Sequence, residues 1–134
     1  MALVVDASVV VAALVDNSTT GRWAEAQLLS GPLYAPHLLP VEVANILRKA
    51  SRAGQISEDH ASLAHQDLTR LQVELAPYEP FAERVWELRQ GITAYDAWYI
   101  AIAEALKAPL ATLDLRLSRS SSPRCTFQTP TTGP

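Results

Sequence analysis

The sequence predicts an α/β protein: a three-layer α/β/α sandwich with a short parallel sheet. Short apolar runs typical of buried strands alternate with longer helical patterns along the chain. Strands separated by helices form parallel βαβ units with right-handed crossovers, which place helices on both faces of the sheet. The length of 134 residues and the 49% content of hydrophobic residues suit one domain with a packed core.

The first quarter of the chain predicts two strands and two helices. Residues 3–5 are an apolar run suited to a buried strand, and residues 8–15 follow as a short helix. Residues 21–30 are predicted as a helix that ends at Gly31, because glycine and a following proline interrupt helices. Residues 33–35 then form the second strand.

The middle of the chain predicts two helices and a third strand. Pro40 suits the first turn of a helix that runs to Arg52 and ends before Gly54. Ser57 can cap the next helix through its side-chain oxygen. Residues 73–76 form the third strand.

Two further helices and a fourth strand follow. Residues 80–90 are predicted as a helix that ends before Gly91. Residues 93–107 have the strongest helical pattern, and Pro109 stops this helix. Residues 110–113 are the fourth strand.

The C-terminal part has weaker patterns. Residues 118–124 read as a polar loop, and residues 125–127 as a last short strand. We therefore expect a single domain over residues 1–127. Residues 128–134, rich in threonine and proline, are expected to be a disordered tail.

The charge is modest and unevenly distributed. Eleven basic and 14 acidic residues give a net charge of −3, which argues against a protein that coats nucleic acid by charge alone. Residues 1–106 carry 7 basic and 13 acidic residues, whereas residues 107–134 carry 4 and 1. An acidic body with a basic end suits cation binding next to phosphate binding, although an ordinary solvated surface gives the same count.

The N-terminus and the cysteine content suggest a cytoplasmic protein. One cysteine, Cys125, excludes an internal disulfide and favours a reducing compartment. Residues 2–15 are largely apolar, but Asp6 interrupts them and no basic residue precedes them, unlike a signal peptide. The run is also shorter than the roughly 20 residues of a membrane-spanning helix.

Four carboxylates are expected along one edge of the sheet. Asp6 follows the first strand and Asp114 follows the fourth. Glu42 and Asp96 each lie in the first turn of a predicted helix. In a parallel α/β sheet, strand carboxyl ends and helix N-termini share the edge at which ligands bind. The sequence therefore predicts one acidic cluster built from four segments.

Each of these residues, taken alone, also has a structural explanation. Asp6 suits a turn or a helix cap, and Asp96 a helix cap. The helix dipole favours Glu42 in a first turn, and Asp114 can simply end a strand. Taken together, however, close carboxylates repel and raise one another's pKa. A cluster without an evident basic partner therefore favours a bound cation. Ligands that are all oxygen favour a hard ion such as Mg²⁺ or Mn²⁺.

Other chemistries find little support in the sequence. The three histidines, His37, His60 and His65, do not have the spacing of a zinc site. The five glycines form no dinucleotide-binding, phosphate-loop or nucleophile-elbow motif. Cys125 has no evident catalytic partner.

On these residues the chain resembles the PIN-domain ribonucleases, specifically the VapC-type toxins of bacterial toxin–antitoxin pairs. The resemblance runs from Val4 to about Leu117. Four motifs in this order carry it: Val-Val-Asp6-Ala-Ser8, Glu42-Val-Ala-Asn45-Ile-Leu, Thr93-Ala-Tyr-Asp96-Ala and Thr112-Leu-Asp114.

The resemblance implies a site and a reaction. It identifies Asp6 and Asp96 as metal ligands, with Glu42 and Asp114 completing the catalytic pocket. The implied reaction is hydrolysis of RNA phosphodiester bonds, in which Mg²⁺ or Mn²⁺ lowers the pKa of water and neutralises phosphate charge. Three further positions match supporting polar residues of the family: Ser8, Asn45 and Thr112.

The resemblance also implies partners. A VapC-type toxin pairs with a VapB-like antitoxin and usually forms a homodimer. Candidates for the dimer contact are the apolar residues Leu28, Leu29, Trp98 and Tyr99. Candidates for contact with RNA phosphates are Lys107, Arg116 and Arg119.

Two alternatives belong to other functional classes. A non-catalytic binding module on the same scaffold, acting through an antitoxin-like partner, normally lacks one or more of the acids, and all four are present here. A Mg²⁺-dependent phosphatase of the haloacid dehalogenase type requires Asp-x-Asp, whereas this chain has Asp6-Ala-Ser8. A phospho-receiver domain requires paired acids after the first strand and a late lysine, and the sequence lacks both.

Overall fold

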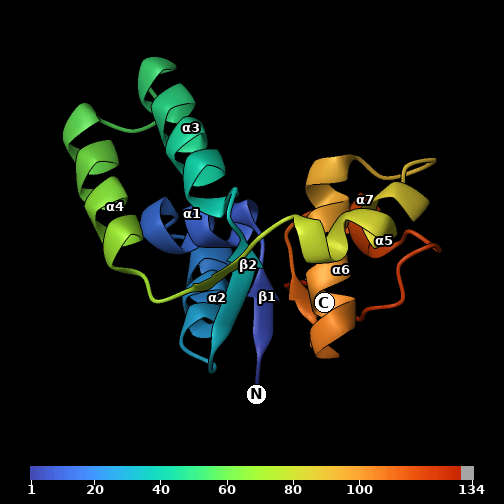
Figure 1. Cartoon of the computed structure of the whole chain (residues 1–134). Coiled ribbons are helices and arrows are strands. Elements are labelled where there is room, and N and C mark those ends of the chain that lie inside the picture. Colours follow the sequence, from blue (N-terminus) through green and yellow to red (C-terminus); the bar gives the residue numbers. More distant parts are fainter. Residues whose placement is uncertain (131–134) are drawn as a thin grey trace.

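A parallel sheet forms the middle layer of the protein. The computed structural model describes residues 1–130. Its strands are β1 (Leu3–Val5), β2 (Leu33–Pro36), β3 (Glu74–Ala76), β4 (Leu110–Ala111) and β5 (Phe127–Gln128). Within the described range these five strands are all parallel, in the order β3-β2-β1-β4-β5 (Figure 1).

Helices cover both faces of this sheet. They are α1 (Ala7–Val15), α2 (Thr19–Leu28), α3 (Leu39–Arg52), α4 (Glu58–Arg70), the 3-10 turn η1 (Glu79–Phe81), α5 (Ala82–Glu87), α6 (Ala94–Leu106) and α7 (Leu115–Ser118). Helix α1 contacts α2, α3 and α4, whereas α6 contacts β1, β2 and β4 and carries α5 on its outer side (Figure 1). This arrangement confirms the predicted α/β/α sandwich. None of the helices in residues 1–130 is long and apolar enough to span a bilayer.

The structure corrects several predicted boundaries. The last strand, predicted at residues 125–127, lies at Phe127–Gln128 because these two residues pair with β4. Gln128 therefore belongs to the sheet and not to the predicted tail, of which residues 131–134 lie outside the described range. Strand β4 ends at Ala111, two residues earlier than predicted. The prediction also lacked α7, and its helix 80–90 consists of η1 and the short α5.

The central strand positions the functional edge. Val4 and Val5 of β1 are fully buried, as expected for a strand covered by helices on both faces. Val5 pairs with Ala111 of β4, so both strands end at the same level of the sheet. Asp6 and Thr112 are the next residues of the two strands, and they leave the sheet at its carboxyl edge side by side.

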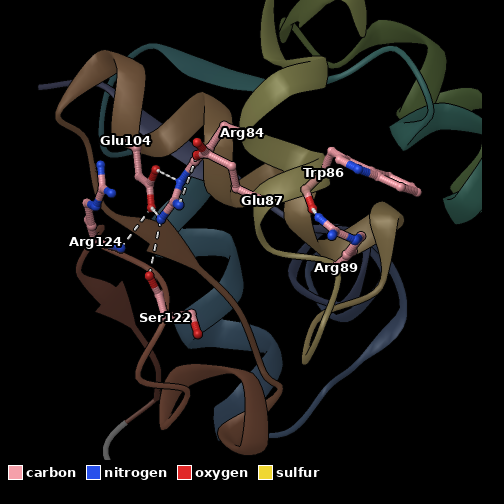
Figure 2. Close-up of polar contacts among 7 residues, drawn as sticks. All are labelled: Arg84, Trp86, Glu87, Arg89, Glu104, Ser122 and Arg124. Atoms are coloured by element: carbon pink, nitrogen blue, oxygen red, sulfur yellow. Dashed lines mark hydrogen bonds and ion pairs between the residues drawn. The ribbon is translucent and has the colours of Figure 1, made fainter.

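A partly buried ion pair joins three segments on the α6 side. Arg84 of α5 contacts Glu104 of α6 through two hydrogen bonds, with Nε–Oε1 at 2.7 Å and Nη2–Oε2 at 3.1 Å (Figure 2). Arg84 also donates to the carbonyl of Ser122, and the backbone N–H of Arg124 donates to Glu104. Burial raises the pKa of Glu104, but these donors outweigh it, so the net pKa lies below the usual value. The ion pair therefore fixes the loop that follows α7 onto α5 and α6.

Arg84→Met is expected to lower the free energy of unfolding at pH 7 by about 1–3 kcal/mol, because Glu104 keeps only one backbone donor. A carboxyl with a lowered folded-state pKa stabilises the fold above its unfolded-state pKa, and this contribution disappears as the pH falls through the folded-state value. The difference between variant and parent should therefore shrink below roughly pH 4. Urea denaturation at several pH values measures this difference in the free energy of unfolding. Arg70→Met, at an exposed arginine, is the control and should change stability by less than about 0.5 kcal/mol.

Candidate active site at the carboxyl edge of the sheet

Asp6 is the most deeply buried acid of the site. It caps α1, accepting the backbone N–H of Val9 at 3.2 Å. Its Oδ1 also accepts the Ser8 hydroxyl at 2.5 Å, and its Oδ2 accepts the Thr112 hydroxyl. Burial raises the pKa of Asp6 more than these hydrogen bonds lower it, and the charge of Asp96 raises it further. The carboxylate is thus held in one orientation in an environment that disfavours its charge.

Glu42 approaches this carboxylate from α3. It lies in the first turn of α3, and its Oε1 accepts the hydroxyl of Tyr99 from α6 at 2.7 Å. Burial raises the pKa of Glu42, the Tyr99 hydrogen bond lowers it, and the charges of Asp96 and Asp6 raise it again. The Glu42–Tyr99 hydrogen bond therefore ties α3 to α6 across the site.

Tyr99 is a site residue that the sequence does not single out. The sequence analysis predicts Tyr99, with Trp98, as a candidate dimer contact, but only 2% of Tyr99 is exposed, so this prediction is wrong for Tyr99. The available signal is its position three residues after Asp96, which places both residues on one face of α6. Tyr99 therefore holds an acid of the cluster in place, through its hydrogen bond to Glu42.

Asp96 occupies the first turn of α6, but the helix cap is Thr93, whose hydroxyl accepts the N–H of Asp96 at 3.2 Å. Burial raises the pKa of Asp96, and the charge of Asp114 raises it further. An open pocket of about 280 Å³ lies in front of both carboxylates. Its lining comprises Gly91, Ile92, Thr93, Asp96, Asp114, Arg116, Leu117 and Ser120.

Asp114 has a structural role as well as a place in the pocket. Its Oδ1 accepts the N–H groups of Arg116 and Leu117 at 3.0 and 3.1 Å, so it caps α7. Its own N–H donates to Thr112 Oγ1 at 3.0 Å. The alternative that Asp114 simply ends a strand is therefore wrong, because β4 ends at Ala111 and Asp114 caps α7, which holds its carboxylate at the pocket.

The supporting polar residues fall into two groups. Ser8 and Thr112 both donate to Asp6, and Ser8 also accepts the N–H of Leu113 at 3.1 Å. Asn45 instead accepts the Nε of Arg48 at 3.1 Å. The structure thus brings Ser8 and Thr112 to the buried acid, whereas Asn45 is engaged along α3.

The candidate phosphate-binding residues do not all lie near the acids. Arg116 lines the acidic pocket. Lys107 follows the last residue of α6, eleven positions after Asp96, which corresponds to about 16 Å along a helix. It lines a different pocket with Glu104. Of the three predicted phosphate-binding residues, the structure therefore places Arg116 beside the acids, whereas Lys107 lies elsewhere and Arg119 is not part of the lining of the acidic pocket.

The donor set fits a hard divalent cation. The charge of a neighbouring acid raises the pKa of three carboxyls: Asp6, Glu42 and Asp96. None of the three takes part in an ion pair within residues 1–130. In the same range, no three histidine, cysteine or acidic side chains are grouped to hold an ion by themselves. Mg²⁺ is usually bound by one or two carboxylates together with water and substrate phosphate, so a site for this ion needs no group of three protein ligands.

Comparison with known proteins identifies the family. A family model described as PIN domain matches residues 3–121. Two relatives from Mycobacterium tuberculosis (strain ATCC 25618 / H37Rv) are similar over most of their length. Ribonuclease VapC9 is 37% identical over 92% of this chain and 94% of its own, and Ribonuclease VapC1 is 40% identical over 90% and 95%.

Among solved structures, the fold is similar to that of VapBC2 from Rickettsia felis bound to a DNA fragment from its promoter. The TM-score is 0.65 at 15% identity, covering 96% of this chain and 98% of that chain. The sheet order, the acids at its carboxyl edge and the relatives agree with the resemblance seen in the sequence. The chain belongs to the PIN-domain family, with VapC ribonucleases among its relatives.

Proposed function

We propose that the protein is a metal-dependent endoribonuclease that acts as the toxin of a toxin–antitoxin pair. One observation carries this proposal: acids from separate segments meet at the carboxyl edge, and the pKa values of Asp6, Glu42 and Asp96 are all raised. Burial is the largest cause of each shift, and the charge of a neighbouring acid adds to it. Carboxyls perturbed in this way are typical of functional sites, and a bound cation would offset the repulsion between them. The relatives named VapC ribonucleases support RNA as the substrate.

The protein residues have distinct roles in this proposal. Asp6 and Asp96 are the metal ligands, and Glu42 and Asp114 complete the catalytic pocket. Ser8 and Thr112 orient the Asp6 carboxylate, and Tyr99 orients Glu42. A bound Mg²⁺ or Mn²⁺ supplies Lewis-acid chemistry for phosphodiester hydrolysis by lowering the pKa of water and neutralising charge on the phosphate. Arg116 lies in the same pocket, where a guanidinium suits an RNA phosphate.

We further propose a VapB-like antitoxin as partner and a homodimer as the assembly. The structural neighbour from Rickettsia felis is a VapBC complex, which supports the first proposal. Leu29 is 86% exposed at the end of α2, and this exposure supports its candidacy for a contact between copies.

Incubation of the purified protein with total cellular RNA in Mg²⁺ or Mn²⁺, followed by sequencing of the new 5′ ends, tests the ribonuclease proposal. We expect discrete cleavage sites that disappear when a chelator is added. The alternative, a non-catalytic binding module, predicts that no new ends appear under any metal condition while an antitoxin-like partner still binds. Cleavage that continues unchanged in chelator would refute the metal dependence.

A further inference from the structure

An exposed tryptophan with an arginine stacked on it lies next to the acidic pocket along the chain. Trp86, near the end of α5, is 66% exposed. The Arg89 guanidinium lies 4.7 Å from the centre of its ring, and Arg89 Nη1 donates to the Trp86 carbonyl at 2.8 Å. Figure 2 shows Trp86 pointing away from the Arg84–Glu104 ion pair. The indole is therefore held in place while much of it remains accessible to solvent.

The chemistry of this pair matches a nucleotide. Among residues 1–130 the ion pairs join Arg84 to Glu87 and Glu104, so Arg89 has no carboxylate partner there. A guanidinium without such a partner is a good donor to a phosphate. An exposed indole stacks on any nucleobase, because every base has a π-face. One base and one phosphate thus find complementary groups on adjacent side chains.

Short turns tie the pair to the acidic pocket. The N–H of Arg89 donates to Trp86 O at 3.2 Å, and the N–H groups of Gly91 and Ile92 donate to Leu88 O at 3.4 and 3.2 Å. Gly91 and Ile92 line the acidic pocket. Arg89 is two residues from Gly91, a separation of at most about 7 Å between Cα atoms. The backbone of the Trp86–Arg89 pair therefore lies close to residues that line the acidic pocket.

We propose that Trp86 and Arg89 form a binding subsite for single-stranded RNA, in which a base stacks on the indole and Arg89 contacts a phosphate. This inference rests on the proposed ribonuclease function, because the RNA that occupies the subsite is the substrate of the acidic pocket. The subsite holds a nucleotide that flanks the scissile bond, so it contributes to substrate affinity and not to the chemical step.

Binding to two fluorescein-labelled probes tests the proposal: a 12-nucleotide oligo(A) RNA and an abasic ribose-phosphate chain of equal length. Fluorescence anisotropy is measured with the Asp96→Asn chain, so that the probes stay intact. Adding Trp86→Ala should weaken oligo(A) binding about tenfold or more and leave binding of the abasic chain unchanged. Trp86→Phe, which keeps an aromatic face, should retain most of the affinity.

Arg89→Ala should weaken binding of both probes and reduce the slope of log Kd against log salt concentration by about 0.7, as expected for one lost phosphate contact. Leu63→Ala is the control, because Leu63 is 60% exposed but lies on α4. This substitution should change neither affinity.

Equal oligo(A) affinity of the Trp86→Ala chain and its parent would overturn the proposal, as would an equal loss for both probes. So would a change from dimer to monomer in sedimentation at unchanged RNA affinity, because Trp86 would then be a contact between copies. Failure of the ribonuclease function is a separate result: the chain would not cleave RNA, yet Trp86 would still determine the affinity for oligo(A).

Discussion

Asp96→Asn is expected to reduce RNA cleavage by about 100-fold or more and to raise the melting temperature of the metal-free protein. The activity falls because the amide cannot replace an anionic ligand whose cation stabilises several kcal/mol of transition-state charge. Stability rises because burial and the charge of Asp114 both oppose ionisation of Asp96. Initial cleavage rates and thermal unfolding in chelator measure the two effects.

Asp96 is a better position for this test than Asp6. The Asp6 carboxylate accepts hydrogen bonds from Ser8, Thr112 and the Val9 N–H, and an amide cannot accept all of them. Asp67→Asn, at an exposed position on α4, is the matched control and should leave both activity and stability unchanged. An Asp96→Asn protein that cleaves RNA at the parental rate would contradict the assignment of Asp96 as a ligand.

Gly21→Ala is expected to lower the free energy of unfolding by about 3 kcal/mol or more, which corresponds to roughly 10 °C in melting temperature. Gly21 lies inside α2, where alanine is normally the better helix former. Here, however, an added Cβ would lie 1.8 Å from the carbonyl oxygen of Asp16, the C-cap residue that follows α1. Because the clash is with backbone, the contact between α1 and α2 must open to relieve it.

Gly91→Ala is the control for this substitution. An added Cβ at Gly91 meets no atom within 4 Å, so stability should stay within about 0.5 kcal/mol of the parent. Thermal unfolding of both variants gives the comparison. Equal melting temperatures of Gly21→Ala and the parent would mean that α1 and α2 do not approach as closely as described.

The sequence predicts most of the fold because β1, β2 and β4 lie in short apolar runs that clear helix patterns separate. The position of Asp6 follows from the same logic: a residue directly after a buried parallel strand must lie at the carboxyl edge. The same rule places Asp96 at that edge, through the N-terminus of a strongly patterned helix. A local sequence pattern is therefore enough to predict the position of a residue that lies at the end of a single strand or helix, as Asp6 and Asp96 do.

Features that depend on contacts between distant segments could not be predicted. The Glu42–Tyr99 hydrogen bond joins residues 57 positions apart, and no local pattern encodes it. The limits of β5 are set by pairing with β4, so the strand predicted at residues 125–127 differs from the observed Phe127–Gln128. Helix α7 is only four residues long, and its one sequence signal is Asp114, which also fits the end of a strand and a catalytic acid.

The central claim is that these carboxylates form a divalent-metal site that cleaves RNA. Titration of the protein with Mn²⁺, followed by calorimetry for binding and by RNA cleavage for activity, tests it most directly. We predict that binding and activation share one midpoint and that Asp96→Asn abolishes both. Full cleavage in chelator, or saturating Mn²⁺ binding that is unchanged by Asp96→Asn, would contradict the claim.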